Sequence, residues 1–141
     1  MIDIHIADEL EKELCYKIRE DVFTYGQKVP KKIDSDGLDE TSTHVILYYS
    51  KIPVGTARIR IIDNNLKLER ISILEQYRGK GLGKELMKFL IEYSKTKNID
   101  GIVMNAQAYL QSFYEKFGFK KEGEIFKSSG IPHIRMYLSF K

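Results

Sequence analysis

The residues with the clearest chemistry are three glycines at alternate positions, Gly79, Gly81 and Gly83, with cations around them. Glycine lets the backbone turn sharply and present its N–H groups. A helix that begins at Leu82 would add unpaired N–H groups and the positive end of its dipole, and both favour an anion. The cations are Arg78, Lys80 and Lys84. This combination predicts a site for a ligand with more than one phosphate, and a glycine-rich turn without a ligand is the alternative.

Two well-known phosphate-binding loops do not fit this stretch. The P-loop requires G-x-x-x-x-G-K-[ST], a spacing that the chain lacks. The dinucleotide fingerprint requires G-x-G-x-x-G early in a βαβ unit, whereas here the run is G-x-G-x-G in mid-chain. Neither the P-loop nor the dinucleotide fingerprint therefore describes this stretch.

A strand before the loop and a helix after it are the elements that would position it. Residues 68–74 carry β-branched and aliphatic side chains among charged ones, as a partly buried strand does. After the glycines, apolar residues recur at helical spacing. These are Leu82, Leu86, Phe89, Leu90 and Tyr93.

The N-terminal part predicts a strand, a helix and a hairpin. Alternation predicts the strand at residues 2–6, and Asp8 can cap a helix that ends near residues 23–25. Four-residue spacing predicts the buried stripe of this helix. Its members are Leu10, Leu14, Ile18 and Val22. A connection over residues 26–43 leads to strands at 44–50 and 54–62.

The C-terminal part predicts a crossover and a closing pair of strands. A strand at residues 101–105 should lie parallel to the 67–74 strand, because a helix joins the two. A second helix at 108–117 would place Leu110, Phe113 and Phe117 toward the core and stop at Gly118. Strands at 119–126 and 134–140 complete the order β-α-β-β-β-α-β-α-β-β. This order predicts an α/β fold with a mixed sheet and helices on both sides.

Composition predicts an ordinary globular domain. The 141 residues carry a net charge of +3 with both signs interspersed, so we expect one domain over 1–141 and no nucleic-acid partner. The apolar runs are strand-sized and residues 1–5 do not resemble a secretory signal, so we expect a cytoplasmic protein without membrane association. The single cysteine, Cys15, fits a reducing compartment and is interpreted as structural. No zinc-type spacing is present, and no metal is expected.

The stretch Arg78-x-x-Gly81-x-Gly83 matches the [QR]-x-x-G-x-[GA] pyrophosphate loop of the GNAT N-acetyltransferases, and the whole chain resembles that superfamily. The second half continues the resemblance with Asn105-Ala106-Gln107 and with Phe113-Tyr114-x-x-x-Gly118-Phe119. The resemblance implies the GNAT fold, a mixed and mostly antiparallel sheet of about seven strands with helices on both faces. It also implies acetyl-CoA as the cofactor.

Two further stretches resemble the ElaA/YjcF-like branch of the family. One runs from Arg19-Glu20-Asp21-Val22-Phe23 through Gln27-Lys28-Val29-Pro30 and Asp36-Gly37-Leu38-Asp39 to His44. The other is Gly130-Ile131-Pro132-His133-Ile134. The branch usually has Glu before the Gln, where this chain has Gly26. The departure removes a carboxylate from the expected acceptor side and leaves the cofactor segments intact.

The resemblance implies the following cofactor contacts. The strand residues Ile71, Ser72 and Ile73 would offer backbone groups to the acetyl group and pantetheine. The loop and helix start, Arg78, Gly79, Lys80, Gly81, Leu82, Gly83 and Lys84, would hold the pyrophosphate. Asn105, Gln107, Phe113 and Tyr114 would complete the acetyl-CoA side.

Acetyl transfer to an amine needs a polarised thioester, a neutral nucleophile and a proton for the departing thiolate. Tyr114 is the candidate acid, since a phenol can protonate a thiolate. Glu69 could accept the amine's proton or could instead pair with Arg58 or Arg60 across the strands. His133 is a second candidate for proton transfer. The candidate acceptor-binding residues are Arg19, Gln27, Arg58 and His133.

The leading hypothesis is an enzyme that moves an acetyl group from acetyl-CoA to a primary amine of a small molecule, directly and within a ternary complex. Two alternatives stay open. One is a non-catalytic module that binds or senses acyl-CoA, and the other is acyl-homoserine-lactone synthesis on a related fold. A homodimer is also left open.

Overall fold

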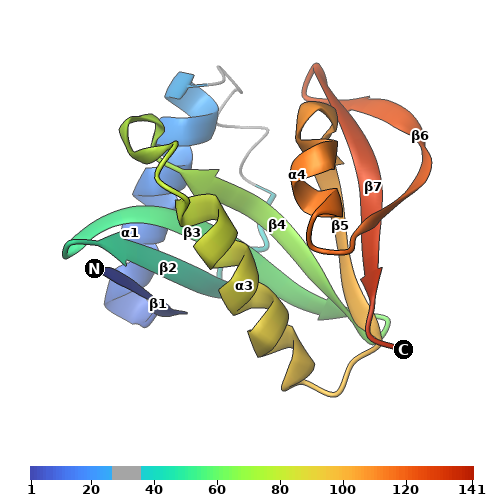
Figure 1. Ribbon diagram of the computed structural model, residues 1–141. Coiled ribbons are helices and arrows are strands. Elements are labelled where there is room, and N and C mark those ends of the chain that lie inside the picture. The colour runs from blue at the N-terminus through green and yellow to red at the C-terminus, as the bar shows by residue number, and fades with distance from the viewer. Residues whose placement is uncertain (27–35) are drawn as a thin grey trace. The chain divides into compact units, whose positions relative to one another are not determined.

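The computed structural model describes residues 1–26 and 36–141, and its strands and helices follow the predicted order (Figure 1). The strands form a mixed seven-stranded sheet in the order β1-β2-β3-β4-β5-β7-β6. The chain divides into two compact units, Met1–Ile59 with Arg70–Phe89 and Arg60–Glu69 with Leu90–Lys141. Strand β3 (Ile52–Ile62), strand β4 (Asn65–Ile73) and helix α3 (Leu82–Lys95) contribute residues to both units.

The first unit contains an antiparallel set of strands that agrees with the predicted hairpin. Strand β1 (Ile2–Ile6) pairs with β2 (Thr43–Tyr49), and β2 pairs with β3. The β2–β3 turn is tighter than predicted, because Ser50 and Lys51 adopt positive φ angles of 49° and 71° and β3 already begins at Ile52. Such a turn matches the twist of the two strands. Central residues of β2 and β3 are buried on both faces, as expected for strands with a helix on each side. Figure 1 shows α1 behind these strands and the first turns of α3 in front of them.

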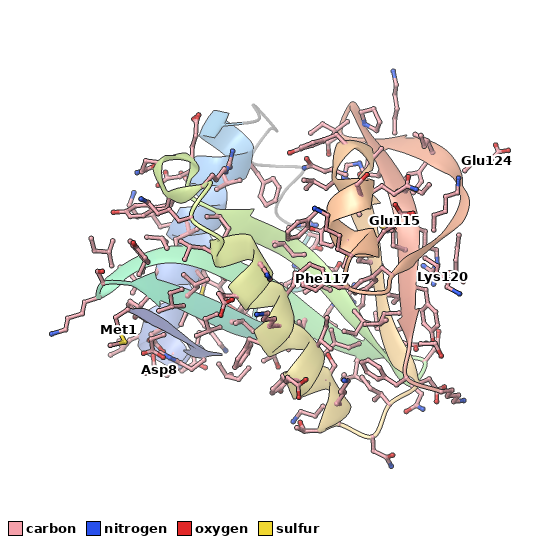
Figure 2. All side chains as sticks on the ribbon, in the orientation of Figure 1. Met1, Asp8, Glu115, Phe117, Lys120 and Glu124 are labelled. Atoms are coloured by element: carbon pink, nitrogen blue, oxygen red, sulfur yellow. The ribbon has the colours of Figure 1, made fainter. Side chains whose placement is uncertain are left out.

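Helix α1 (Glu9–Arg19) is capped by Asp8, which is labelled in Figure 2. The Asp8 side chain accepts a hydrogen bond from the backbone N–H of Glu11, and the Glu11 side chain accepts one from the backbone N–H of Asp8, which makes a capping box. The helix continues as a π-helix, η1 (Glu20–Gly26), so the helical segment ends where the sequence predicted.

The predicted buried stripe of α1 is wrong in its first half. Leu10 is 85% exposed and Leu14 is 38% exposed. The buried residues are Cys15, Ile18, Arg19 and Val22. Residues four apart advance by about 40° around a helix with 3.6 residues per turn, so a strict four-residue repeat drifts away from one face. The buried residues are instead three, one and three positions apart, and side chains with this spacing lie on one face of a helix.

Helix α3 follows its prediction closely. Leu82, Leu86 and Leu90 are buried, whereas Phe89 and Tyr93 are only half-buried. Met87 and Ser94 are buried with them. Among the described residues, no helix is long and apolar enough to cross a membrane.

The second unit contains the crossover and the closing strands. Strand β5 (Gly101–Gln107) pairs in parallel with residues 65–68 of β4, as the helical connection predicted. On its other side, β5 pairs antiparallel with β7 (Ile131–Ser139), which in turn pairs with β6 (Lys120–Ser128). Strand β6 is exposed along its whole length, and Figure 2 shows Lys120 and Glu124 along it.

The predicted second helix is shorter and partly of a different type. A 3₁₀ turn, η3 (Ala108–Leu110), precedes α4 (Gln111–Glu115), and Gly118 ends the segment with φ of 99°. Leu110, Phe113 and Phe117 were predicted to face the core, yet they are only half-buried. Tyr114 is the buried residue of this helix, at 5% exposure. The 3₁₀ start changes the rotation per residue and so brings a different side chain inward.

Candidate functional site

The glycine loop lies in the first unit between β4 and α3. A 3₁₀ turn, η2 (Glu75–Tyr77), leads into Gly79 and Gly81, whose φ angles of 81° and 78° lie in the left-handed region. A Cβ at either glycine would meet nothing within 4 Å. These positions therefore favour glycine for its backbone conformation rather than for lack of space. Residues 78–81 are exposed, and α3 begins at Leu82, so the first helical turn has backbone N–H groups without a partner inside the helix, and such groups favour an anion.

The predicted cations surround this loop. Arg78 donates from Nε to the carbonyl oxygen of Ile73 at 3.0 Å. Its two Nη groups have no hydrogen-bond partner among the described residues. Lys80 and Lys84 are exposed, and the Lys80 ammonium lies 5.8 Å from the ring centre of Tyr49. That distance is within the range of a cation–π contact. Arg78 and Lys80 thus come just before α3 in the chain, and Lys84 lies in its first turn.

An aromatic pair beside the loop was missed by sequence reasoning. The rings of Tyr49 and Tyr77 meet edge to face with centres 6.0 Å apart. Tyr49 comes from the end of β2, which is distant in sequence, so no local spacing could have associated it with Lys80.

The strand residues assigned to the acetyl group follow a break in the regular pleat. Ile71 and Ile73 are half-buried and Ser72 is buried. Arg70 has φ of 54°, and Ser72 donates its hydroxyl to the Arg70 carbonyl oxygen at 3.2 Å. Regular alternation along the strand would place Glu69 on the same face as Ile71, but the positive φ of Arg70 between them interrupts that alternation.

Glu69 makes one of the two ion pairs that the sequence left open. In the second unit, Arg60 donates from Nε to Oε1 of Glu69 at 2.6 Å and from Nη2 to Oε2 at 3.2 Å. A bidentate pair of this kind occupies both carboxylate oxygens and fixes their orientation. In any role as a base, Glu69 would have to accept the amine's proton on a lone pair that Arg60 does not use, or give up one of these contacts.

Two of the residues assigned to the acceptor are buried in a network of charges, and Gln27 lies outside the described residues. Arg19 donates from Nη1 and Nη2 to the two Asp39 oxygens at 3.0 and 2.5 Å. Arg58, which is 0% exposed, donates to both Asp36 oxygens at 2.8 and 2.6 Å and from Nη1 to Asp39 at 3.1 Å. Arg19 therefore anchors the segment that carries Asp39. The assignment of Arg58 to the acceptor is at odds with its complete burial.

The network shifts the acid–base equilibria of its members. Hydrogen bonds from Arg58 hold the pKa of Asp36 far below its ordinary value. Burial alone would raise the pKa of Asp39, but the hydrogen bonds and positive charges of Arg19 and Arg58 together outweigh burial, so the pKa is lowered. His44 donates from Nε2 to the Asp39 carbonyl oxygen at 2.9 Å, and burial lowers the pKa of this imidazole. The network thus consists of ionised carboxylates and a neutral histidine.

A depressed carboxyl pKa makes a prediction about acid stability. Stability from Asp36 is present above its unfolded pKa of about 3.9 and is lost as the pH falls below that value. We therefore expect Asp36→Asn to lower the melting temperature at pH 7 and to differ less from the wild type as the pH falls from about 5 to 3. Thermal unfolding followed by circular dichroism at several pH values measures this difference. A difference that stays constant over the range would contradict the assignment.

The remaining candidates lie in the second unit. The Tyr114 ring contacts Phe113 and Phe119 with centres 5.1 and 6.1 Å apart. Burial raises the pKa of Tyr114, so its phenol is protonated at neutral pH, as a proton donor must be. Gln107 is the β5 partner of His133 on β7, and Asn105 is exposed on the same strand.

His133 has a defined tautomer. Its Nδ1 lies 2.7 Å from the carbonyl oxygen of Ile131, and a carbonyl oxygen only accepts. The neutral ring therefore carries its hydrogen on Nδ1, which leaves the lone pair of Nε2 available for a proton. Phe126 stacks on the ring at 6.0 Å.

Comparisons with known proteins agree with this fold. The family described as "Acetyltransferase (GNAT) domain" matches residues 6–140. The uncharacterized N-acetyltransferase YjcF of Bacillus subtilis is 37% identical over 130 residues, which is 92% of each chain. Protein ElaA of Escherichia coli is 34% identical over 141 residues, 95% of this chain and 92% of its own.

Solved structures agree as well. The crystal structure of E. coli ElaA superposes with a TM-score of 0.87 at 28% identity, over 99% of this chain and 100% of the other. A Bacillus subtilis acetyltransferase in complex with CoA shares the fold, with a TM-score of 0.77 at 20% identity over the full length of both chains.

The chain belongs to the GNAT acetyltransferase family. Within the family it falls in the ElaA/YjcF-like branch, as the two N- and C-terminal signatures predicted.

Proposed function

We propose that the protein transfers an acetyl group from acetyl-CoA to a primary amine of a small molecule, by direct transfer in a ternary complex. The observation that carries the proposal is the loop before α3, with its two left-handed glycines, its exposed residues 78–81 and its three cations. These features suit a pyrophosphate, since two linked phosphates need several donors and more than one positive charge. The name of the CoA-bound neighbour supports the same cofactor.

The bound cofactor would supply an activated thioester, and this chain's residues would do the rest. Residues 78–84 would hold the pyrophosphate. A backbone N–H on the strand Ile71–Ile73 would donate to the thioester carbonyl oxygen and so favour the charge that develops there. Ser72 would contribute its backbone N–H here, because its hydroxyl already donates a hydrogen bond to the Arg70 carbonyl oxygen.

Two side chains would move protons. Tyr114, protonated at neutral pH, would donate to the departing thiolate. His133 would accept the amine's proton at Nε2, since Nδ1 donates to Ile131. Glu69 stays a second candidate base, through a lone pair that the ion pair with Arg60 does not use.

We further propose that residues 1–141 act as one acetyltransferase domain, because the family match spans 6–140. The proposed location is the cytoplasm, on the basis of the single cysteine, which is buried and free.

Release of the CoA thiol tests the proposal. Purified protein would be mixed with acetyl-CoA and a panel of small amines, and free thiol would be followed with a chromogenic disulfide. We expect release that depends on both the protein and an amine. Tight acetyl-CoA binding without amine-dependent release would identify the sensing module instead. Release that requires S-adenosylmethionine would identify acyl-homoserine-lactone synthesis.

A further inference from the structure

Arg70 has an unusual backbone for a residue in the middle of a strand. Its φ of 54° lies in the left-handed region, where the Cβ of an L-residue meets the following carbonyl oxygen. An arginine keeps such a conformation only where surrounding contacts hold it, and these conformations are concentrated at functional sites. The next residues along β4 are Ile71, Ser72 and Ile73, the strand proposed to polarise the thioester.

Contacts at the carbonyl group and at the side chain help to hold Arg70 in place. Ser72 donates its hydroxyl to the Arg70 carbonyl oxygen at 3.2 Å. The Arg70 side chain reaches in the other direction and donates from Nη2 to Oδ2 of Asp36 at 3.3 Å. The residue is thus held at its carbonyl group and at the end of its side chain.

Asp36 is itself held firmly. The fully buried Arg58 binds both of its oxygens, at 2.8 and 2.6 Å, and the N–H of Leu38 donates to Oδ1 at 3.1 Å. The carboxylate is therefore held by contacts of its own, and the Arg70 side chain binds to it. Oδ2 of Asp36 accepts from Arg58 and Arg70 together.

We infer that Asp36 is a positioning residue for the proposed acetyl transfer, because its ion pair with Arg70 holds the left-handed turn that aims the backbone N–H groups of residues 71–73. The inference rests on the proposed function. The peptide plane between Arg70 and Ile71 is rigid, so the dihedral angles of Arg70 set the direction of the Ile71 N–H. Relaxation of Arg70 to an extended conformation would rotate that plane away from its present direction.

The chain offers a matched control in Asp39. This carboxylate belongs to the same network and binds Arg19 and Arg58. Asp39→Asn makes the same chemical change as Asp36→Asn, in the same network, but leaves the contact between Asp36 and Arg70 in place. A general weakening of the network would affect both variants.

The test uses the carbonyl stretching frequency of carbon-13-labelled acetyl-CoA bound to the full chain, measured by infrared difference spectroscopy. In the wild type we expect a frequency below that of free acetyl-CoA, as a hydrogen-bonded carbonyl shows. Asp36→Asn should move it back toward the free value, and Asp39→Asn should not. Affinity for acetyl-CoA should change less than about twofold, because residues 78–84 are untouched. With an amine substrate, kcat should fall about 10- to 100-fold in Asp36→Asn, as for misplacement of one catalytic donor.

Substitutions at Arg70 make the test independent of how well Asp36→Asn folds. Arg70→Gly removes the side chain but accepts the left-handed conformation, whereas Arg70→Ala removes the side chain and disfavours it. We expect Arg70→Gly to keep more of the frequency shift than Arg70→Ala. Adding Asp36→Asn to Arg70→Gly should cause no further change.

Each contrary outcome has a distinct meaning. If the wild type does not bind acetyl-CoA, the proposed function and this inference both fail. If it binds with a shifted carbonyl that Asp36→Asn leaves unchanged, the inference alone fails. It also fails if Arg70→Gly and Arg70→Ala give the same frequency.

Discussion

Tyr114→Phe should lower kcat by about 10²–10⁴-fold while leaving acetyl-CoA affinity nearly unchanged, because general acid catalysis typically contributes that much. The substitution removes one hydroxyl and keeps the ring that packs on Phe113 and Phe119. The Tyr114 hydroxyl has no hydrogen-bond partner among the described residues, so its loss should leave no unsatisfied group and little change in stability. Steady-state kinetics with one amine acceptor, after thermal stability is shown to match, measures the effect.

Cys15→Ala is the control for this experiment. Cys15 is 1% exposed, and burial raises the pKa of its thiol, so little nucleophilic thiolate forms near neutral pH. We expect its removal to leave kcat largely intact. If the chemical step limits the rate, a normal kcat in Tyr114→Phe would contradict the role of Tyr114 as the general acid. An inactive but well-folded Cys15→Ala enzyme would instead indicate a covalent acyl-enzyme.

Gly101→Ala should be the most damaging conservative change in the second unit. A Cβ at Gly101 would lie 2.2 Å from the Leu138 carbonyl oxygen and 2.8 Å from the Tyr137 hydroxyl. The β5 and β7 backbones would have to separate where Gly101 pairs with Ser139. Overpacking against a backbone atom reaches about 3 kcal/mol, which for a chain of this length lowers the melting temperature by on the order of 10 °C.

Gly123→Ala provides the comparison for that loss. Gly123 has φ of 78° but nothing within 4 Å of a Cβ, so this variant adds backbone strain without steric overlap. Its melting temperature should fall by only a few degrees, because a left-handed alanine costs roughly 1–2 kcal/mol. Equal melting temperatures of the two variants would show that steric overlap at Gly101 does not lower the stability of the protein.

Much of the fold could be predicted because its determinants are local. The glycine turn, the helix from Leu82 and the short hairpin turns are encoded by neighbouring residues, and a helical crossover then requires β4 and β5 to be parallel. The face of α1 that is buried could not be predicted. It depends on which side of the helix meets the strands, and that is decided by residues far away in the sequence.

The candidate site, too, could be predicted only where its determinants are local. The phosphate loop could be predicted from a sequence motif, since its glycines and cations lie within seven residues. The contacts of Asp36 with Arg58 and Arg70 join residues 22 and 34 positions apart, and nothing in the local spacing selects these partners. The left-handed backbone of Arg70 was equally hidden, because arginine carries no sequence signal for that conformation.

Calorimetric titration of CoA into the wild type, Arg78→Ala and Gly81→Val tests the central claim most directly. A Cβ at position 81 would meet no atom within 4 Å, but a valine would be strained at φ of 78°, so the substitution should disturb the N–H groups of the loop through its backbone. Gly123→Val has the same φ and the same open surroundings away from the loop, and serves as the control.

We predict that CoA binds the wild type and Gly123→Val equally. Binding to Arg78→Ala should be at least about tenfold weaker, since a charge-assisted contact contributes roughly 1.5–3 kcal/mol. Gly81→Val should weaken binding by a similar factor or more. Equal CoA affinity in all four proteins would contradict the assignment of residues 78–84 to the pyrophosphate.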